Sequence, residues 1–314
     1  MSGPLPSPAT YNATPTSGST PDLRGRVCVV TGATRGIGRA AAMRFAQLGA
    51  EVVLVGRDER LLDDVRAEVQ RVAKNDRVFW VRADFASLAS VRAVAEEIAH
   101  RWPAIHVLVN NAGVNSARRA TSTDGHEVTF AVNYLAPFLL TTLLVPAIAR
   151  GGTSRIVNVT SIFAHLARVD FDDLMFERRR YDSTIAYNQS KLAITMFTME
   201  LGERLEGSGV TVNCVSPGLV ATDIMREHAL FTVEWLRPLW RAMLLTPEQA
   251  AERIVRVATS SASGTVTGQC FAGSDRTILV PFAARNTGAR RRLWDVSTQL
   301  THAPELSAAA RGAR

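Results

Sequence analysis

Two side chains four residues apart have the chemistry to transfer a proton. Tyr187 and Lys191 stand at the start of a helical pattern, so the phenol and the ammonium lie on one helix face. A tyrosine has an intrinsic pKa of about 10, too high for a base at neutral pH, but a neighbouring ammonium favours the phenolate. Tyr-x-x-x-Lys is also a common coincidence, so its meaning depends on what surrounds it.

A hydroxyl at the end of a predicted strand indicates where Tyr187 and Lys191 would meet a substrate. Ser161 follows the strand-like run at 155–160, and an open α/β sheet places its ligands at the carboxyl ends of its strands. Two alternatives stay open: Ser161 as a cap at the strand end, and Thr160 as the active hydroxyl. Acid–base chemistry on a bound substrate is the favoured interpretation.

A glycine-rich turn supplies a second candidate site. Residues 31–38 read Thr-Gly-Ala-Thr-Arg-Gly-Ile-Gly and connect the first strand-like run to a helical pattern. Gly32 permits a tight turn, Gly36 lets the backbone approach a pyrophosphate, and Gly38 allows close helix–strand packing. The helix N-terminus then offers free N–H groups and a favourable dipole to an anion. At the first strand–helix junction, this pattern predicts a dinucleotide site.

Two arginines bear on which dinucleotide is bound. The end of the second strand carries an acidic residue where a ribose 2′-hydroxyl is bound, whereas an arginine accommodates a 2′-phosphate. This chain has Arg57 followed by Asp58 there, and Arg35 within the glycine-rich turn. Guanidinium groups match phosphate geometry, so we expect NADP(H), with NAD(H) as the alternative. Asp58 is expected to cap the next helix, and solvated surface charge is the alternative role for both arginines.

The secondary-structure elements that must position these residues follow a regular strand–helix alternation. Short β-branched runs alternate with amphipathic helical patterns along residues 24–285, without a linker or an internal repeat. Strands without strict polar alternation, each followed by a helix, predict a parallel sheet covered on both faces. We expect a single α/β domain with a doubly wound (Rossmann) fold and about seven parallel strands. The expected strands are 26–31, 51–56, 78–83, 106–110, 155–160, 210–215 and 269–273.

The two ends of the chain differ from this domain. Residues 1–23 are rich in Pro, Ser, Thr and Gly and lack the features of a signal peptide, so we expect a disordered lead-in. Residues 286–314 form a basic tail that is expected to lie outside the catalytic core. This tail, with Arg35 and Arg57, explains most of the formal charge of +7. No basic face with interleaved aromatics appears, so nucleic acid is not an expected partner.

An apolar stretch and three cysteines bear on the compartment. Residues 128–149 contain Asn133, threonines and two prolines, so we expect a buried helix and no transmembrane segment. Cys28, Cys214 and Cys270 lie in strand-like runs without a C-x-x-C pattern. We expect buried free thiols, no metal site and a cytoplasmic protein.

Together, these features resemble the short-chain dehydrogenase/reductase family over residues 24–285. Their order along the chain is highly specific. The matching pieces are the glycine-rich turn, Asp84 after the third strand, the run Asn-Asn-Ala-Gly at 110–113, Asn133, Ser161, Tyr187 with Lys191, and Pro217-Gly218 with Thr222.

The resemblance implies a role for each of these residues. Tyr187 is then the general acid/base, and Ser161 hydrogen-bonds the substrate oxygen. Lys191 binds the nicotinamide ribose and lowers the tyrosine pKa. Asn133 holds a water that links the lysine to solvent, with a purely structural role as the alternative.

The expected cofactor contacts extend along both halves of the site. Asp84 is expected at the adenine, the run at 110–113 along the adenosine side or in a structural role, and Thr222 near the carboxamide. The full set is Gly32, Thr34, Arg35, Gly36, Ile37, Gly38, Arg57, Asp84, Asn110, Ala112, Gly113, Tyr187, Lys191, Pro217, Gly218 and Thr222.

Two further features narrow the resemblance. Ser161 and Tyr187 are farther apart than in the shorter family members, and the runs at 161–165 and 291–295 are similar to the retinol dehydrogenase and protochlorophyllide-reductase-like branch. This branch implies a bulky apolar substrate. The aromatic-rich segment 219–245 is expected to be a lid over that substrate. Packing, a homo-oligomer contact and a membrane surface are its alternative roles.

The sequence thus predicts an NADP(H)-dependent oxidoreductase that interconverts a carbonyl and an alcohol on a bulky apolar substrate. Two alternatives use the same fold: a non-redox enzyme such as an epimerase or dehydratase, and a regulatory protein that only binds NADP(H). The combination of Ser161, Tyr187, Lys191 and Asn133 favours the oxidoreductase.

Overall fold

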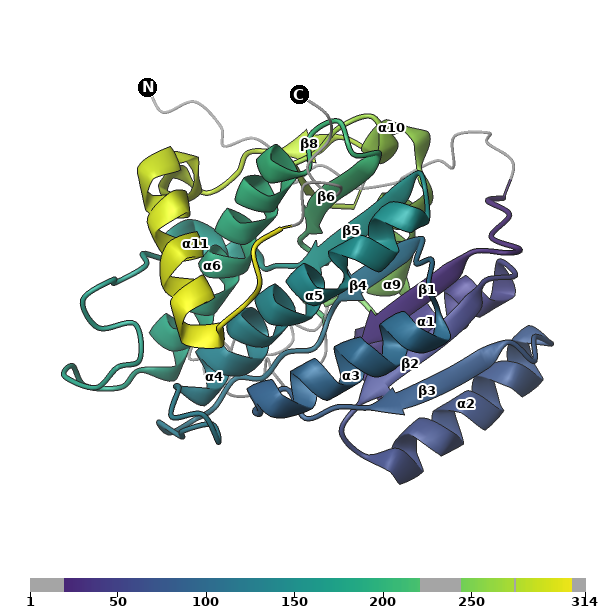
Figure 1. Ribbon diagram of the computed structural model, residues 1–314, viewed down its shortest axis with the longest axis horizontal. Helices are drawn as coiled ribbons and strands as arrows, with labels where there is room; N and C mark the ends of the chain where they lie inside the picture. Colours follow the sequence, from purple (N-terminus) through teal and green to yellow (C-terminus); the bar gives the residue numbers. More distant parts are fainter. Residues whose placement is uncertain (1–19, 221–243, 274, 307–314) are drawn as a thin grey trace, which may run out of the picture.

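An eight-stranded sheet forms the centre of the molecule, with helices on both faces (Figure 1). This computed structural model describes residues 20–220, 244–273 and 275–306. The strand order is β3-β2-β1-β4-β5-β6-β7-β8, and neighbours are parallel except β7 and β8. The expected α/β fold is confirmed, with an antiparallel edge strand added to seven parallel ones. The strands are β1 (Val27–Thr31), β2 (Glu51–Gly56), β3 (Val78–Arg82), β4 (Val107–Asn110), β5 (Ser154–Val159), β6 (Val210–Val215), β7 (Cys270–Phe271) and β8 (Thr277–Ile278).

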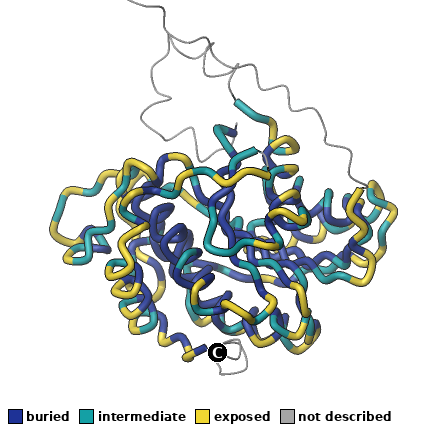
Figure 2. Tube along the Cα trace, turned by 90° about the horizontal axis from the view of Figure 1, so that it is seen from above, coloured by how far each residue is buried: buried dark blue, intermediate teal, exposed yellow. Residues whose placement is uncertain are grey.

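Two sets of helices cover the two faces of the sheet. One set packs its apolar side chains around Phe45, Leu62 and Ile254, which are fully buried. The other set contributes to a second, larger apolar core. Figure 2 shows the buried backbone at the centre and exposed positions along the outer loops. The first set is α1 (Gly36–Gln47), α2 (Glu59–Ala73) and α9 (Pro247–Thr259), and the second is α3 (Leu88–Arg101), α5 (Ala136–Arg150) and α6 (Ser183–Arg204).

The order of the strands reverses at β1. This strand pairs with β2 on one side and with β4 on the other, so the connections that leave β1 and β4 diverge. Such a switch point opens a crevice at the carboxyl ends of the strands. The glycine-rich turn after β1 and the asparagine run after β4 therefore meet at one edge of the sheet.

The apolar stretch that begins at Val128 is a core element. α4 (Val128–Phe130), the π-helical turn η1 (Ala131–Leu135) and α5 continue one another. In the described residues this is the one helical stretch long and apolar enough to cross a membrane, and 89% of its most apolar window is buried inside the protein. The expectation of a buried helix is confirmed.

The C-terminal segment belongs to the folded domain. Residues 287–301 form α11 (Thr287–Thr301), which packs on α6 and buries Leu293 and Trp294 in the larger core (Figure 1). Arg290 is also buried and pairs with Glu200 and Glu203 of α6. For the described residues 286–306, the expectation that this basic segment lies outside the catalytic core is therefore wrong, because their apolar stripe and one arginine are core groups.

Two of the three cysteines form a disulfide. Cys214 of β6 and Cys270 of β7 are paired positions in the parallel ladder, with Cα atoms 4.7 Å apart, and are linked as a disulfide. Cys28 is a buried free thiol. The expectation of three free thiols holds for Cys28 and is wrong for the other two, because strand register places them side by side.

Most of the expected lid, 219–245, lies outside the described residues, which include only its two ends. The N–H of Leu245 donates to the carbonyl of Leu219 at 2.8 Å. A bridge between Val220 and Leu245 adds to this contact. The segment therefore leaves and rejoins the domain at one place, beside Gly218.

Candidate active site

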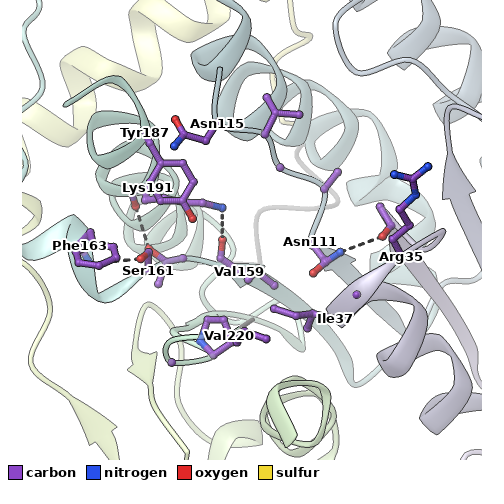
Figure 3. Close-up of a pocket in the computed structure, with 18 of the residues that line it drawn as sticks. Arg35, Ile37, Asn111, Asn115, Val159, Ser161, Phe163, Tyr187, Lys191 and Val220 are labelled. Carbon is purple, nitrogen blue, oxygen red and sulfur yellow. Dashed lines mark hydrogen bonds between the residues drawn. The ribbon is translucent and has the colours of Figure 1, made fainter. Parts of the chain in front are cut away.

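A pocket of about 610 Å³ opens at the carboxyl ends of β1, β4, β5 and β6 (Figure 3). Each strand contributes the residues that directly follow it, and α6 contributes two side chains that reach the same space. The pocket thus brings together most of the residues that the sequence singled out. These are Gly32, Thr34, Arg35, Gly36, Ile37, Ala112, Gly113, Ser161, Tyr187, Lys191, Pro217 and Gly218.

The glycine-rich turn has the backbone that its sequence requires. Gly32 and Gly36 have φ angles of 65° and 51°, in the left-handed region that favours glycine. A Cβ added at Gly38 would lie 2.3 Å from the Gly32 carbonyl oxygen and 2.4 Å from Nδ2 of Asn111. Gly38 therefore lets α1 pack against the turn, as its position in the motif predicts.

The N-terminus of α1 is open toward the pocket. α2, α3 and α6 each begin with a side-chain cap, supplied by Asp58, Ser87 and Asp182. α1 begins at Gly36, and its N-cap residue, Arg35, supplies no side-chain cap. Its first N–H groups and the positive end of its dipole are therefore available to an anion. A dinucleotide pyrophosphate has the charge and the shape that this cradle accepts.

Asn111 and Thr31 hold the two halves of the crevice together. Nδ2 of Asn111 donates to the carbonyl of Thr31 at 2.9 Å, and the Thr31 hydroxyl accepts N–H bonds from Asn111 and Ala112 at 3.0 Å. Asn111 also lines the pocket. It belongs to the run at 110–113 that was expected along the adenosine side, although the full set of expected contacts does not name it.

Arg35 and Arg57 are both exposed near the end of β2. The turn that carries Arg35 contacts β2 directly, because a Cβ added at Gly56 would lie 3.0 Å from Cγ2 of Thr34. In the described part of the chain, neither arginine has an ion pair, and only Arg35 lines the pocket. Asp58 accepts the N–H of Leu61 at 3.1 Å, so its expected role as a helix cap is confirmed.

Tyr187, Lys191 and Ser161 meet at the floor of the pocket (Figure 3). Nζ of Lys191 lies 5.6 Å from the centre of the Tyr187 ring and donates to the Val159 carbonyl at 3.0 Å. The Ser161 side chain accepts the N–H of Phe163 and hydrogen-bonds Tyr187. The hydroxyl of Thr160, the alternative to Ser161, is used in a hydrogen bond within the protein, since it donates to the Lys191 carbonyl at 3.0 Å.

Burial shifts the two titratable side chains in opposite directions. It raises the pKa of Tyr187 to about 12, and the hydrogen bond with Ser161 opposes this shift. It lowers the pKa of Lys191 to about 8. The protein groups alone therefore do not lower the tyrosine pKa as expected, because the cost of burying a phenolate outweighs its hydrogen bond.

Asn133 is held by protein groups on several sides. Its Oδ1 accepts the N–H of Val114 at 2.8 Å, and its Nδ2 donates to the Val114 carbonyl and to Oγ of Ser190, both at 2.9 Å. It lies in the π-helical turn η1. Asn133 is thus a clamp on the segment after Gly113, which agrees with the structural alternative for this residue.

Five expected cofactor contacts are not in the pocket wall that the structure describes. One of them, Gly38, packs α1 against the glycine-rich turn. Asp84 accepts the N–H of Ala86 at 3.0 Å. Asn110 is buried and donates to Thr141 and Asn158, each at 2.8 Å, so it holds the central strands together. Arg57 stands outside the pocket lining, and Thr222 lies outside the described residues.

Apolar and amide side chains that no motif marks complete the wall. Val159 is the last residue of β5, and the other five come from the segments that follow β4, β5 and β6. Position relative to a strand end is the signal that would have found them. They are Val114, Asn115, Val159, Phe163, Leu219 and Val220.

Comparisons with known proteins agree with this geometry. The model of the short chain dehydrogenase family matches residues 26–230. Human retinol dehydrogenase 11 is 39% identical over 91% of this chain and 89% of its own length. Human retinol dehydrogenase 13 is 37% identical over 88% of this chain and 85% of its own length.

Solved structures show the same fold. An uncharacterised protein from Mycobacterium paratuberculosis superposes with a TM-score of 0.75 at 28% identity, covering 92% of this chain and 97% of that one. A short chain dehydrogenase/reductase family protein superposes with a TM-score of 0.60 at 27% identity, covering 81% and 97%. The chain belongs to the short chain dehydrogenase family, whose members are oxidoreductases that bind NAD or NADP.

Proposed function

We propose that the protein is an NADP(H)-dependent oxidoreductase that interconverts a carbonyl and an alcohol on a bulky apolar substrate. The meeting of Tyr187, Lys191 and Ser161 in the pocket that also contains the glycine-rich turn carries this proposal. A bound nicotinamide dinucleotide supplies the hydride acceptor or donor. The residues of the chain supply the proton and hold the substrate oxygen.

Tyr187 and Ser161 act together on that oxygen. Their hydroxyls donate hydrogen bonds where negative charge develops, which stabilises the transition state more than the bound substrate. In the direction of reduction, the Oη–H bond of Tyr187 breaks and its proton passes to the oxygen. A tyrosine whose pKa is about 12 is protonated at neutral pH and is ready for this step.

Lys191 stabilises the phenolate that remains. Its ammonium lies close enough to the ring to favour the charged form once the proton has left. A Cβ added at Gly113 would lie 3.6 Å from Nζ of Lys191 and 3.3 Å from Oδ1 of Asn133. Asn133 thus clamps a segment that passes beside Lys191, which supports a positioning role for Asn133.

The preference for NADP(H) rests on charge at the end of β2. Asp58, the carboxylate that directly follows Arg57, is used as the cap of α2. Arg35 and Arg57 are exposed and lack ion pairs in the described residues, so both are available to a 2′-phosphate. The contact between the glycine-rich turn and Gly56 keeps Arg35 near that strand end.

Two observations support the substrate class. Val114, Val159 and Phe163 are apolar side chains that line the pocket together with Tyr187. The relatives named retinol dehydrogenases make a retinoid-like aldehyde or alcohol a suitable first substrate. A homo-oligomer and a cytoplasmic location stay predictions.

A fluorescence titration tests the cofactor preference. We expect NADPH to bind at least tenfold more tightly than NADH, because a charge-assisted bond to the phosphate contributes about 1.5–3 kcal/mol. Arg57→Asp is expected to remove this preference. Equal affinity for both dinucleotides in both proteins would contradict the role of the arginines. Net consumption of NADPH with retinal separates the oxidoreductase from a non-redox enzyme.

A further inference from the structure

The side-chain amide of Asn115 lies in the active-site pocket and lacks hydrogen-bond partners in the described residues. Both its Nδ2 and its Oδ1 are buried, and neither has a hydrogen-bond partner in the described part of the chain. Asn115 is the one asparagine or glutamine there for which this holds at both atoms. Buried amides nearly always have partners in native proteins, so this pair of orphan atoms points to a group that the chain does not supply.

The backbone on both sides of Asn115 is fixed. Before it, the N–H and carbonyl of Val114 are both bonded to the Asn133 side chain. After it, the hydroxyl of Tyr181 donates to the carbonyl of Ser116 at 3.0 Å and lies 3.1 Å from Oε1 of the fully buried Glu127. The amide is therefore presented by a rigid segment, and a loose surface loop does not explain its lack of partners.

The position of Asn115 connects this amide to the reaction. Asn115 lines the same pocket as Tyr187 and Ser161. Figure 3 shows its side chain beside Tyr187, at the end of the pocket away from Arg35. The glycine-rich turn, where the phosphates are expected, is at the other end. A group that meets Asn115 therefore belongs to the end of the site where the substrate and the nicotinamide react, away from the phosphates.

We propose that Asn115 determines specificity by binding a second oxygen of the substrate, a hydroxyl or keto group on the apolar skeleton near the reacting carbonyl. This inference rests on the proposed function. An amide offers two donors and an acceptor, so a hydroxyl satisfies it best. A substrate with one polar group, the reacting carbonyl itself, leaves the amide unpaired. The preferred substrate is thus an oxygenated apolar molecule.

The test compares carbonyl substrates that differ by one hydroxyl. We would measure kcat/KM with NADPH for decanal and for its monohydroxylated derivatives, with the hydroxyl at successive carbons. The wild-type protein should favour one hydroxydecanal over decanal by about tenfold, which is about 1.4 kcal/mol. Asn115→Leu, which has the same branching of side-chain atoms but no polar group, should lose that ratio. Val114→Ala, which alters the neighbouring apolar wall, should change both rates by a similar factor.

Three results would overturn the inference. One is the absence of a preferred hydroxyl position in the wild-type protein. The second is an equal effect of Asn115→Leu on decanal and the hydroxydecanals, which would indicate a structural role only. The third is weaker NADPH binding by Asn115→Leu with an unchanged substrate ratio. If the wild-type protein oxidises no NADPH with any aldehyde, the proposed function itself fails, and the inference fails with it.

Discussion

The contact between α11 and α6 yields a prediction whose size can be estimated from the structure. We consider Arg290→Met, which removes a buried guanidinium. The Arg290 side chain is 4% exposed; its Nε lies 3.7 Å from Oε2 of Glu200, and it also pairs with Glu203. Its Nη1 donates to the carbonyl of Ala284 at 3.2 Å. The substitution keeps the apolar stem and removes all of these polar contacts.

Removal of one partner of a buried ion pair costs about 3–5 kcal/mol, because the other charge stays buried. Glu200 keeps a bond to Arg204 at 2.9 Å, and Glu203 is half exposed. We therefore expect the lower end of the range, about 3 kcal/mol. With a urea m-value of about 3 kcal/mol/M for a chain of this size, the midpoint of unfolding should fall by about 1 M.

Urea unfolding followed by circular dichroism measures this change. The double variant Arg290→Met with Glu200→Leu should recover most of the loss, since a well-packed apolar pair can replace a buried ion pair. Activity of the folded fraction should change little, because Tyr187 and Lys191 lie elsewhere on α6. A midpoint shift below about 0.2 M, or no recovery in the double variant, would refute the account of this contact.

Two further predictions concern the site. The pKa of Lys191, lowered to about 8 by burial, means that the free protein loses the ammonium as the pH rises through 8. The value of kcat/KM for reduction, which reports the free enzyme, should therefore be constant below this pH and fall above it. Lys191→Met should have a low kcat/KM at every pH and should not show the fall above a pH of about 8. A wild-type kcat/KM that stays constant up to a pH of about 9.5 would contradict the role of Lys191. Gly38→Ala places a methyl group 2.3 Å from the Gly32 carbonyl, so NADPH affinity should fall at least a hundredfold by titration, about 3 kcal/mol. Gly288→Ala, whose nearest neighbour is 3.4 Å away, is the control, and equal binding by both variants would count against the close packing of the turn.

Short sequence patterns predict those parts of the site whose geometry depends only on the backbone of a few adjacent residues. The turn at Gly32, the cap formed by Asp58, and the common helix face of Tyr187 and Lys191 each follow from a few adjacent residues. The strand ends that carry Ser161 and the asparagine run follow from the β–α rhythm together with the switch point. These features need no information about distant partners.

The features that the sequence did not predict depend on pairs far apart in the chain. Arg290 belongs to a basic run, and no residue near it in the sequence indicates that it pairs with Glu200 of another helix. The Cys214–Cys270 disulfide depends on the register of β6 against β7, which strand prediction does not supply. Asn115 has no motif of its own, and its meaning comes from the clamps on either side of it and from the pocket that it faces.

Turnover by Tyr187→Phe is the most direct test of the central claim, that Tyr187 transfers the proton in a carbonyl–alcohol reaction. The variant removes one oxygen from a buried ring and leaves the glycine-rich turn unchanged. We expect it to bind NADPH as the wild-type protein does and to lose at least a thousandfold in kcat, within the range of about 10²–10⁴ for general acid catalysis. Turnover close to that of the wild-type protein, with NADPH still bound, would contradict the account.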